Sequence, residues 1–436
     1  ATISRCTIAG SYSSEEGAGV YLKGGNPKLI NCLLSGNWSG TNGGGLWIDG
    51  SDVDLQGCEF RGNEGSGAAG FGVTGFAADA RAVNCIISGN KAFFGSGGVQ
   101  ILSGDLSLTN CTLNGNHCFA FEGGGLLVSG SNAPVEVNNC IIWKNYAGGT
   151  TGNPGSSVGY GYATQPVVTS SLVEHSGGSS SWVTSIGSNG GGNLDDDPKF
   201  VNVIDPGAFG VTLPNEGGDL ALNEDSPALN AGSLLLLPLD PADLDNDGDL
   251  AEQLPVDLAG NQRVVGPTVD MGPYEAVDLN FLDTDGDGMS DAYEIAHSGT
   301  AIGLNPFDDT DGDGLTTVME YALGLDPAKA LTAPPGAISV VFDAGQSQDY
   351  LTITYEINDD AVIRGAGDTG GFVTVQVERI TDLTDSYGWK LGETVPVSAD
   401  PIAGRPGMLR IVERSILPMG YQRSEYFRLR SEMATP

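Results

Sequence analysis

The chain has 436 residues, of which 67 are glycine, roughly twice the usual share, so long helices are not expected over most of it. Its 19 basic and 55 acidic residues give a net charge of -36, which would repel nucleic acids and anionic membrane surfaces. We therefore expect no nucleic-acid partner. No apolar run approaches the ~20 residues that a bilayer-spanning helix needs, so we expect no transmembrane segment either.

A repeat of about 26 residues occupies the first third of the chain. Six of the seven cysteines are separated by 26, 26, 27, 26 and 29 residues. Apolar residues recur three positions before and two positions after each cysteine, as Leu55 and Phe60 do around Cys58, which is the pattern of strands with one buried face. A period of this length predicts a solenoid. The repeated cysteines are Cys6, Cys32, Cys58, Cys85, Cys111 and Cys140.

Asparagine stands five positions after five of these cysteines. Its side chain can hydrogen-bond to its copy one coil away, at the strand spacing of about 4.8 Å, and it tolerates the left-handed backbone region. Each coil then restarts with glycines and a short strand, and about 26 residues suit three short strands and three turns. The asparagines are Asn37, Asn63, Asn90, Asn116 and Asn145, and the inward positions of the short strand are Val20, Leu46, Phe71, Val99 and Leu126.

Because of this repeat, residues 1 to about 165 resemble the right-handed parallel β-helix proteins of the pectate-lyase type. The resemblance implies an all-β fold, and we assign residues 1–192 to a parallel β-helix. The chain opens at Ala1 inside a coil. We therefore expect that either a leader or further coils precede it, or that another subunit covers this end, which would permit end-to-end self-association into a filament.

Stacked cysteines about 4.8 Å apart fall within the range that disulfides permit, but between apolar neighbours a reduced, buried ladder is the preferred interpretation. Cys118 is out of register with the other six and is expected to be a spare thiol in a turn. His117 beside it invites a Cys/His catalytic pair, yet adjacent residues of a strand point to opposite faces.

Three short motifs follow the repeat, at Asp195–Phe200, Ser226–Gly232 and Val269–Glu275. Together they resemble the closing section of bacterial surface β-helix proteins of the choice-of-anchor type, although Asn230 stands where that pattern has Asp and Pro273 where it has Ala. An open β-helix end exposes unpaired backbone groups. We therefore assign residues 193–277 to a section that closes the β-helix.

The segment 278–330 contains two copies of a twelve-residue acidic pattern. Twelve Asp or Glu and no Lys or Arg lie between positions 278 and 326, so this run needs counterions. In both copies acidic residues stand at positions 1, 3, 5 and 12 with glycine at 6, the spacing of an EF-hand calcium loop. The predicted Ca²⁺ ligands are Asp283, Asp285, Asp287, Asp291 and Glu294 in the first copy, and Asp309, Asp311, Asp313, Thr317 and Glu320 in the second.

This pair of loops resembles the calcium repeats of dockerin and thrombospondin type 3 modules. The alternative is a solvated acidic linker, which would not place glycine and glutamate so regularly. A weaker candidate calcium loop contains Asp243, Asp245, Asp247 and Asp249 but lacks a glutamate at position 12, so that a polar turn is an equal alternative.

Alternating apolar residues predict five strands in residues 331–436, at 338–342, 350–357, 372–380, 408–413 and 426–430. Turns rich in Gly, Asp and Pro separate these strands. The pattern favours a C-terminal β-sandwich.

Carbohydrate binding is the alternative function that the solenoid suggests. Tyr21 and Trp47 occupy outward positions of adjacent coils and could form an aromatic platform for polysaccharide. Glycoside hydrolysis needs two carboxylates about 5 to 9.5 Å apart, and the outward face of that strand offers only Asp49, without a partner. A pair in the turns, Glu59 or Glu64 with Asp79, would keep a polysaccharide lyase or glycoside hydrolase open.

The preferred interpretation is a structural or adhesive protein, secreted or on the surface of a bacterial cell or in its matrix. In this interpretation a β-helix presents a surface, calcium stiffens the junction, and the C-terminal β-sandwich anchors or docks the chain. Its expected partners are calcium and, in the alternative, a cell-surface glycan.

Overall fold

The computed structural model describes residues 1–76, 78–120, 123–130, 135–148, 154–161, 165–203, 217–240, 244–245, 248–265, 268–276, 279, 282–332, 336–343, 348–358, 362, 373–380, 394–403, 405, 408–415 and 426–433. The chain forms two compact units. The first comprises residues 1–264 and 268–276, and the second comprises residues 265–267 and 277–436.

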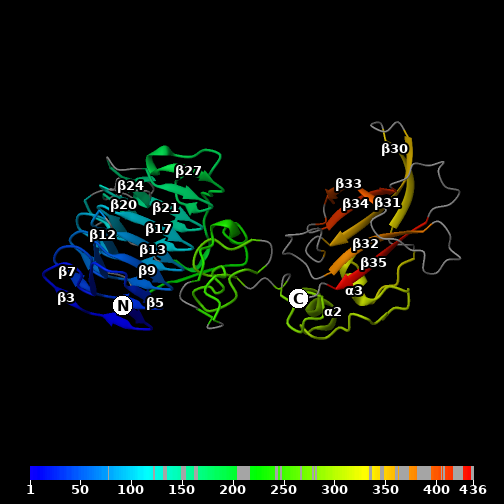
Figure 1. Cartoon of the computed structure of the whole chain (residues 1–436), viewed down its shortest axis with the longest axis horizontal. Coiled ribbons are helices and arrows are strands. Elements are labelled where there is room, and N and C mark those ends of the chain that lie inside the picture. The colour runs from blue at the N-terminus through cyan, green and yellow to red at the C-terminus, as the bar shows by residue number, and fades with distance from the viewer. Residues whose placement is uncertain are drawn as a thin grey trace. The chain divides into compact units, whose positions relative to one another are not determined.

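The first unit is a parallel β-solenoid of about seven coils, as the cysteine period predicts. Its strands stack coil on coil into four parallel sheets, which we name A to D in the order in which each coil contributes to them (Figure 1). Each full coil therefore has four strands where three were expected. The additional strand is the two-residue strand of sheet C, which follows the buried asparagine.

The strand bounds follow the repeat. Sheet A contains β1 (Thr2–Ser4), β5 (Lys28–Ile30), β9 (Asp52–Gln56), β13 (Asp79–Val83), β17 (Asp105–Thr109), β21 (Val135–Asn138), β25 (Val167–Thr169) and β27 (Ser188–Gly191). Sheet B contains β2 (Thr7–Ala9), β6 (Leu33–Ser35), β10 (Glu59–Arg61), β14 (Ile86–Ser88), β18 (Thr112–Asn114), β22 (Ile141–Trp143) and β26 (Leu172–Val173). Sheet C contains β3 (Tyr12–Ser13), β7 (Trp38–Ser39), β11 (Glu64–Gly65), β15 (Lys91–Ala92), β19 (His117–Cys118) and β23 (Tyr146–Ala147). Sheet D contains β4 (Val20–Lys23), β8 (Leu46–Asp49), β12 (Phe71–Thr74), β16 (Val99–Ile101), β20 (Leu126–Val128) and β24 (Val158–Tyr160).

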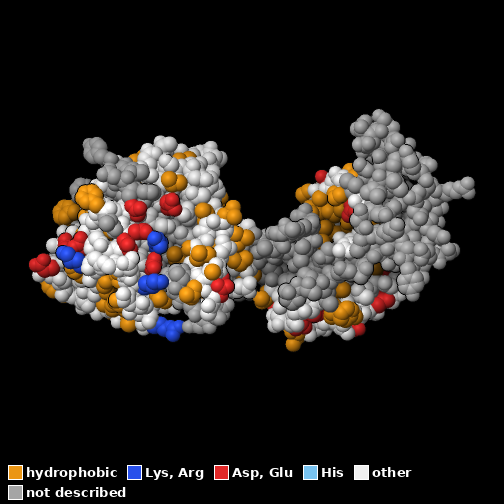
Figure 2. All heavy atoms as spheres, in the orientation of Figure 1, with side chains coloured by type: hydrophobic (Ala, Val, Ile, Leu, Met, Phe, Trp, Pro, Cys, Tyr) orange, Lys and Arg blue, Asp and Glu red, His pale blue; other side chains and the backbone are white. Residues whose placement is uncertain are grey.

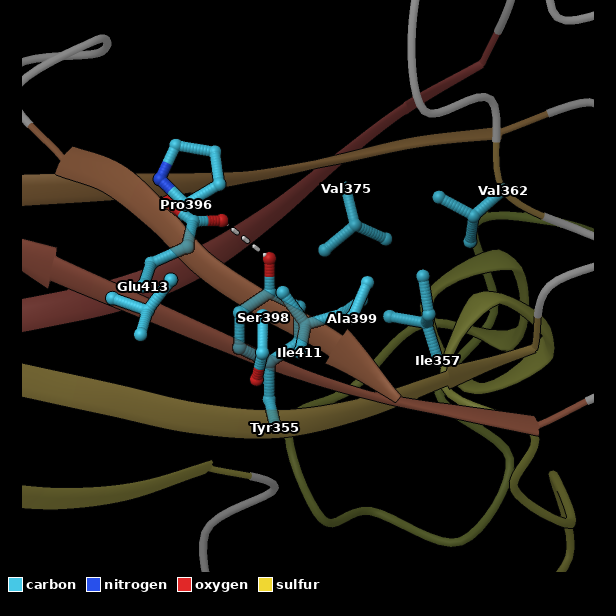
Figure 3. A pocket seen from close by; sticks show the side chains of 10 residues that line it. Tyr355, Ile357, Val362, Val375, Pro396, Ser398, Ala399, Ile411 and Glu413 are labelled. Atoms are coloured by element: carbon cyan, nitrogen blue, oxygen red, sulfur yellow. Dashed lines mark hydrogen bonds between the residues drawn. The ribbon is translucent and has the colours of Figure 1, made fainter. Parts of the chain in front are cut away.

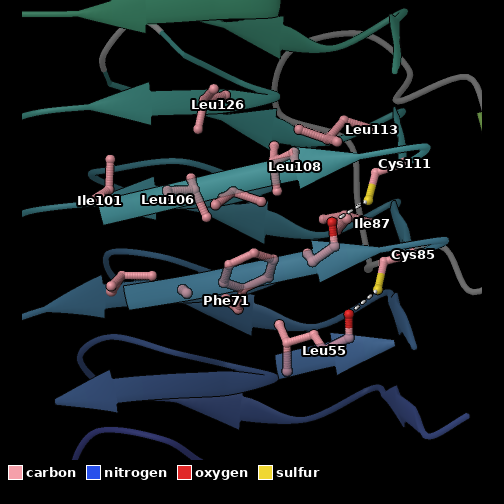
Figure 4. Packing of buried hydrophobic residues seen from close by; sticks show 14 of the residues in the cluster. Leu55, Phe71, Cys85, Ile87, Ile101, Leu106, Leu108, Cys111, Leu113 and Leu126 are labelled. Carbon is pink, nitrogen blue, oxygen red and sulfur yellow. Dashed lines mark hydrogen bonds between the residues drawn. The ribbon is translucent and has the colours of Figure 1, made fainter. Parts of the chain in front are cut away.

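A single apolar core runs through these coils. Leu46, Phe71, Val99 and Leu126 are fully buried, and Val20 of the first coil packs against the same cluster, so the inward positions are confirmed. Residues from successive coils stack in rows, as Ile87 of β14 and Leu113 of β18 do in register (Figure 4).

The cysteines form one of these rows. Five of the six are buried, and Cys6 of the first coil is exposed. Each buried thiol donates to backbone carbonyls, as Cys85 does to Leu55 of the preceding coil at 3.6 Å (Figure 4). Burial raises the pKa of the Cys85 thiol well above its usual range. These cysteines therefore act as small core residues.

The buried asparagine ladder is confirmed. In each step the side-chain amide of one asparagine donates to the side-chain oxygen of the next, at 2.9 to 3.0 Å. The left-handed residue of this turn is the one before the ladder asparagine, for example Gly62 with φ 60° before Asn63. The asparagines therefore supply hydrogen bonds, and the preceding residue supplies the backbone bend.

Cys118 was predicted to lie in a turn, and this is wrong. It belongs to β19, is fully buried, and pairs in register with Ala92 and Ala147. His117 is the first residue of the same strand. Burial and the charge of Lys91 lower the pKa of His117 to about 4.

The last coil is covered by residues that follow β26. The short helix η1 (Thr184–Ile186) buries Ile186 in the solenoid core, and Trp182 packs against the same core. The other elements in the described part of the first unit are α1 (Pro154–Ser157), η2 (Leu234–Leu236) and the antiparallel pair β28 (Phe200–Asn202) and β29 (Asp219–Leu222).

The segment expected to close the solenoid lies against its side. Phe200, Leu220 and Met271 pack on Ile86 and Ile141, which face outward from sheet B. A second row of asparagines, directly before the cysteines, binds this segment. Asn84 donates to the Val256 carbonyl, Asn110 to the carbonyls of Asp270 and Gly272, and Asn139 to the Ser233 carbonyl.

In its described residues the second unit contains two short helices and six strands. The helices are α2 (Asp291–Ser298) and α3 (Thr317–Ala322). Strands β30 (Gly336–Asp343), β31 (Gln348–Asn358), β34 (Met408–Ser415) and β33 (Thr394–Pro401) form an antiparallel sheet in that order, and β32 (Val373–Ile380) pairs with β35 (Tyr426–Met433). The sequence missed β33, which contains two prolines.

A cavity of about 380 Å³ lies beside this four-stranded sheet. Figure 3 shows Ile357, Ile411, Val362 and Val375 along its apolar wall. At one end the Tyr355 hydroxyl donates to Glu413 at 2.7 Å, and the Thr394 hydroxyl donates to the other oxygen of the same carboxylate. Of the described lining residues, Glu413 alone carries a carboxylate, so this cavity offers no set of metal ligands.

Candidate metal centre

The first acidic loop wraps its backbone around the carboxylate of Asp283. One oxygen of this carboxylate accepts from the backbone nitrogens of Gly286 at 2.8 Å and Asp287 at 3.2 Å, and the other accepts from Gly288 at 3.0 Å. Gly288 has a φ of 88°, which glycine adopts without strain. The turn brings oxygen atoms of Asp283, Asp285 and Asp287 within 4.8 Å of one another.

The second loop has the same backbone arrangement. Asp309 accepts from the backbone nitrogens of Gly312 at 2.8 Å, Asp313 at 3.1 Å and Gly314 at 3.1 Å. Oxygen atoms of Asp309, Asp311 and Asp313 also lie within 4.8 Å of one another. Two stretches that are 26 residues apart thus form matching acidic turns.

A short helix after each turn presents the twelfth residue of the pattern. Ser290 caps α2 by accepting from the Tyr293 nitrogen, and the helix buries Asp291 and Glu294 in its first turn. In α3 the equivalent residue is Glu320, which is 1% exposed. Both glutamates are therefore withdrawn from solvent, and their oxygen atoms are not part of the two aspartate groups described above.

Burial and mutual repulsion raise the pKa values of three carboxyl groups in the two loops, those of Asp287, Glu294 and Glu320. Burial raises the pKa of Asp287 to about 7, and the charges of Asp285 and Glu294 add to the effect. Burial likewise raises the pKa of Glu320 to about 7, with contributions from Asp311 and Asp313. The pKa of Glu294 is raised for the same reasons. The folded loops therefore hold negative charge at an electrostatic cost.

The donor set fits a hard divalent cation. Oxygen atoms of Asp287, Glu294, Asp311 and Glu320 are buried and have no hydrogen-bond partner, and in Glu320 this is true of both carboxylate oxygens. A buried oxygen without a donor is costly unless a cation or water satisfies it. Carboxylates clustered around a glycine-containing turn are the ligands that Ca²⁺ prefers.

The residues at position nine are held differently from the other predicted ligands. The carboxylate of Asp291 accepts from the backbone nitrogen of Thr284 at 2.8 Å and from its hydroxyl at 2.6 Å. The Thr317 hydroxyl donates to the Asp308 carbonyl at 3.0 Å. The side chains of Asp291 and Thr317 thus brace their loops.

The weaker candidate loop is only partly described, because Asp243 and Asp247 lie outside the described residues. Asp245 groups with Asp240 and Glu252, whose oxygen atoms lie within 4.8 Å of one another. Asp249 accepts from the Ala251 nitrogen. The sequence missed Asp240 and Glu252 because they stand three positions before and three positions after the alternating aspartates 243–249, outside the calcium-loop spacing.

The predicted aromatic platform is not formed. Trp47 is 2% exposed, whereas Tyr21 is 42% exposed and donates its hydroxyl to Asp49 at 3.0 Å. Trp47 is covered because its ring lies over Gly72 of the next coil, where a β-carbon would come within 2.3 Å of Cζ3. An aromatic pair missed by the sequence lies on sheet C, where Tyr12 stacks on Trp38 with ring centres 4.5 Å apart.

The candidate catalytic carboxylates are not brought together. Glu59 lies in sheet B, Glu64 in sheet C and Asp79 in sheet A. Instead, Asp79 stands in register with Asp52 of the preceding coil and Asp105 of the following coil.

Basic residues lie close to this aspartate row. Acidic and basic side chains gather together over β9, β13 and β17 (Figure 2). Arg81 pairs with Asp79 at 2.5 Å and with Asp54 at 3.9 Å. Neighbouring coils are thus linked by ion pairs on this face.

The family model described as the right handed beta helix region matches residues 1–185. This range ends at the last coil and agrees with the four stacked sheets. A search of curated proteins and a search of solved structures each found no match to the chain. Among the described residues, no helix has both the length and the apolar character needed to cross a bilayer.

Proposed function

We propose that this protein is a structural or adhesive protein of the bacterial cell surface or extracellular matrix, in which two calcium ions stabilise the second unit. The solenoid supplies a stiff scaffold, because its coils are joined by four parallel sheets and a buried asparagine ladder. Because the core is closed, the outer faces of the coils that the following segment does not cover are available to present surface.

The observation that carries the calcium proposal is the burial of Glu320. Its two carboxylate oxygens are buried without a hydrogen-bond donor and face the charges of Asp309, Asp311 and Asp313. A cation supplies the positive charge that this group needs. One ion is assigned to Asp283, Asp285, Asp287 and Glu294, and the other to Asp309, Asp311, Asp313 and Glu320. Modules of this kind in extracellular proteins bind calcium at about 10⁻⁴ to 10⁻³ M.

Isothermal titration calorimetry of the full chain tests this proposal. We expect two calcium ions per chain, and one in each of the single variants Glu294→Gln and Glu320→Gln. Glu224→Gln is the matched control, because Glu224 is exposed and lies outside both loops. The absence of calcium binding at 5 mM, or two ions in both loop variants, would contradict the assignment.

A second candidate function is a carbohydrate-active enzyme, and the aspartate row of sheet A favours it. Adjacent coils are spaced by about 4.8 Å, which is close to the 5 to 5.5 Å between the carboxylates of retaining glycosidases. Asp52, Asp79 and Asp105 could therefore supply an acid and a nucleophile. Turnover of uronate or neutral polysaccharides that is abolished by Asp79→Asn but kept by Asp49→Asn, on sheet D, would favour the enzyme over the structural role.

A further inference from the structure

The two acidic loops differ in how their final glutamate is held. One oxygen of Glu294 accepts from the Leu304 backbone nitrogen at 3.1 Å, which leaves one buried oxygen without a partner. Both oxygens of Glu320 lack a partner. The second loop thus has the greater need of a cation, because nothing within its own backbone compensates the carboxylate.

The helices that carry these glutamates also differ in burial. All six residues of α3 are buried, from Thr317 to Ala322. In α2 only Asp291 and Glu294 are buried, and Ile295 is 41% exposed. Glu320 therefore lies within a helix that is buried along its whole length, whereas Glu294 is a buried residue of a helix that is otherwise at least partly exposed.

The surroundings of α3 are the C-terminal strands. Val318, Met319 and Ala322 belong to the same apolar cluster as Ile353 of β31 and Val377 of β32. The helix contacts β31, β32 and β35. Directly after the helix, a β-carbon at Gly324 would come within 2.5 Å of the Met408 sulfur of β34, so the chain passes close to this sheet.

Asp313, a predicted calcium ligand in the second loop, also holds the segment that leads into β30. One oxygen of Asp313 accepts from the backbone nitrogen of Leu331 at 2.7 Å. The other oxygen accepts from the Leu315 nitrogen at 2.9 Å. Asp313 therefore joins the acidic turn to the segment that enters β30.

We propose that the cation of the second loop controls the seating of α3 on the C-terminal strands, so that filling this site orders β31, β32 and β35, whereas the first site orders only its own turn. This inference rests on the calcium binding proposed above. An ionised carboxylate without donors is strongly unfavourable in an apolar core. Without the cation, α3 leaves the core and the strands lose one wall of their packing.

Hydrogen exchange of the full chain, with 5 mM calcium and with chelator, tests the inference. In the wild type we expect exchange in β31, β32 and β35 to be at least about tenfold faster without calcium, while β17 of the solenoid is unchanged. In Glu294→Gln the calcium response of these strands should persist.

The charge of Glu320 is the cause of this response, and its removal gives the sharpest comparison. In Glu320→Met an apolar side chain of similar size replaces the carboxylate, so the strands should be equally protected with and without calcium. Glu320→Gln is a second variant that keeps the shape, and its strands should exchange more slowly than those of the wild type in chelator.

Calorimetry on the same samples separates the two proposals. If two ions bind but the exchange of β31, β32 and β35 does not change, the coupling is wrong and the calcium assignment stands. If no ion binds, both fail. An equal loss of the calcium response in Glu294→Gln and Glu320→Met would also overturn the division of roles between the two sites.

Discussion

The side-chain oxygen of Asn90 accepts two hydrogen bonds from Asn63 of the preceding coil, from the backbone nitrogen at 2.8 Å and from the side-chain amide at 3.0 Å. The Asn90 amide donates in turn to the Phe60 carbonyl at 2.8 Å. Both asparagines are fully buried. One side chain therefore satisfies donors and acceptors of the neighbouring coil that water cannot reach.

Replacing Asn90 tests the energetic weight of this ladder. We expect Asn90→Ala to lower the free energy of unfolding by about 3 kcal/mol, because buried donors on Asn63 and a buried acceptor on Phe60 lose their partner. Urea unfolding followed by circular dichroism measures the change. Asn26→Ala is the control, because Asn26 is exposed, and its effect should stay within about 0.5 kcal/mol. Equal losses in the two variants would show that the ladder contributes little.

The substitution Gly72→Ala tests whether the absence of a side chain at position 72 is what allows Trp47 to be buried. A methyl group at position 72 meets the indole ring, so Gly72→Ala should displace Trp47 and destabilise the solenoid by about 1 to 3 kcal/mol. Increased quenching of tryptophan fluorescence by acrylamide would report the exposed ring. Gly161→Ala is the matched control, since a β-carbon there meets nothing within 4 Å. Unchanged quenching and stability in Gly72→Ala would contradict the packing described for Trp47.

The raised pKa values of Asp287 and Glu320, both to about 7, predict how stability and calcium binding depend on pH. In the metal-free protein the folded state binds more protons than the unfolded state between the ordinary carboxyl pKa and about 7. The stability of the second unit should therefore fall as pH rises through this window and level off above it.

Calcium binding must release these protons, so its affinity should rise between pH 6 and pH 8. Calorimetry at pH 6.5 in two buffers with different ionisation enthalpies measures the protons released per ion. Glu320→Gln should release fewer protons than the wild type. Identical binding heats in the two buffers would show that the carboxyl groups are already ionised in the metal-free loops.

The solenoid could be predicted because each coil repeats local information. The cysteine period, the strand alternation and the ladder asparagines are all visible within about 26 residues, and each agrees with the others. The exposure of an outward side chain could not be predicted in this way, because the burial of Trp47 depends on a glycine one coil away. The sequence does not state which residue of the next coil lies beneath the ring.

Contacts between segments far apart in the chain could not be predicted from the sequence either. The asparagines before the cysteines bind carbonyls in residues 233–272, which are about 90 to 170 positions away. Strand β33 was missed because its prolines are unfavourable for a strand, yet it lies at the edge of its sheet, where proline is tolerated. The acidic turns were predicted because a calcium loop is specified by residues within twelve positions.

Arg263 provides a test of how the segment beside the solenoid is held. It is fully buried, donates to the Asp270 carbonyl at 2.6 Å and lies 3.3 Å from Glu275, which is also buried. Burial lowers the pKa of Arg263, and it raises the pKa of Glu275 to about 8. In each group the charge of the partner opposes the effect of burial on the pKa, so the two charged forms stabilise each other.

We expect Arg263→Ala to destabilise this segment by about 3 to 5 kcal/mol, because it leaves Glu275 buried without its cation. The double variant Arg263→Met with Glu275→Gln should lose less than the single variant, since no buried charge remains and the glutamine still offers an acceptor to the Asp270 nitrogen. Urea unfolding and limited proteolysis between residues 217 and 276 measure both changes. If the double variant loses as much as Arg263→Ala, packing of the arginine side chain rather than charge compensation holds the segment in place.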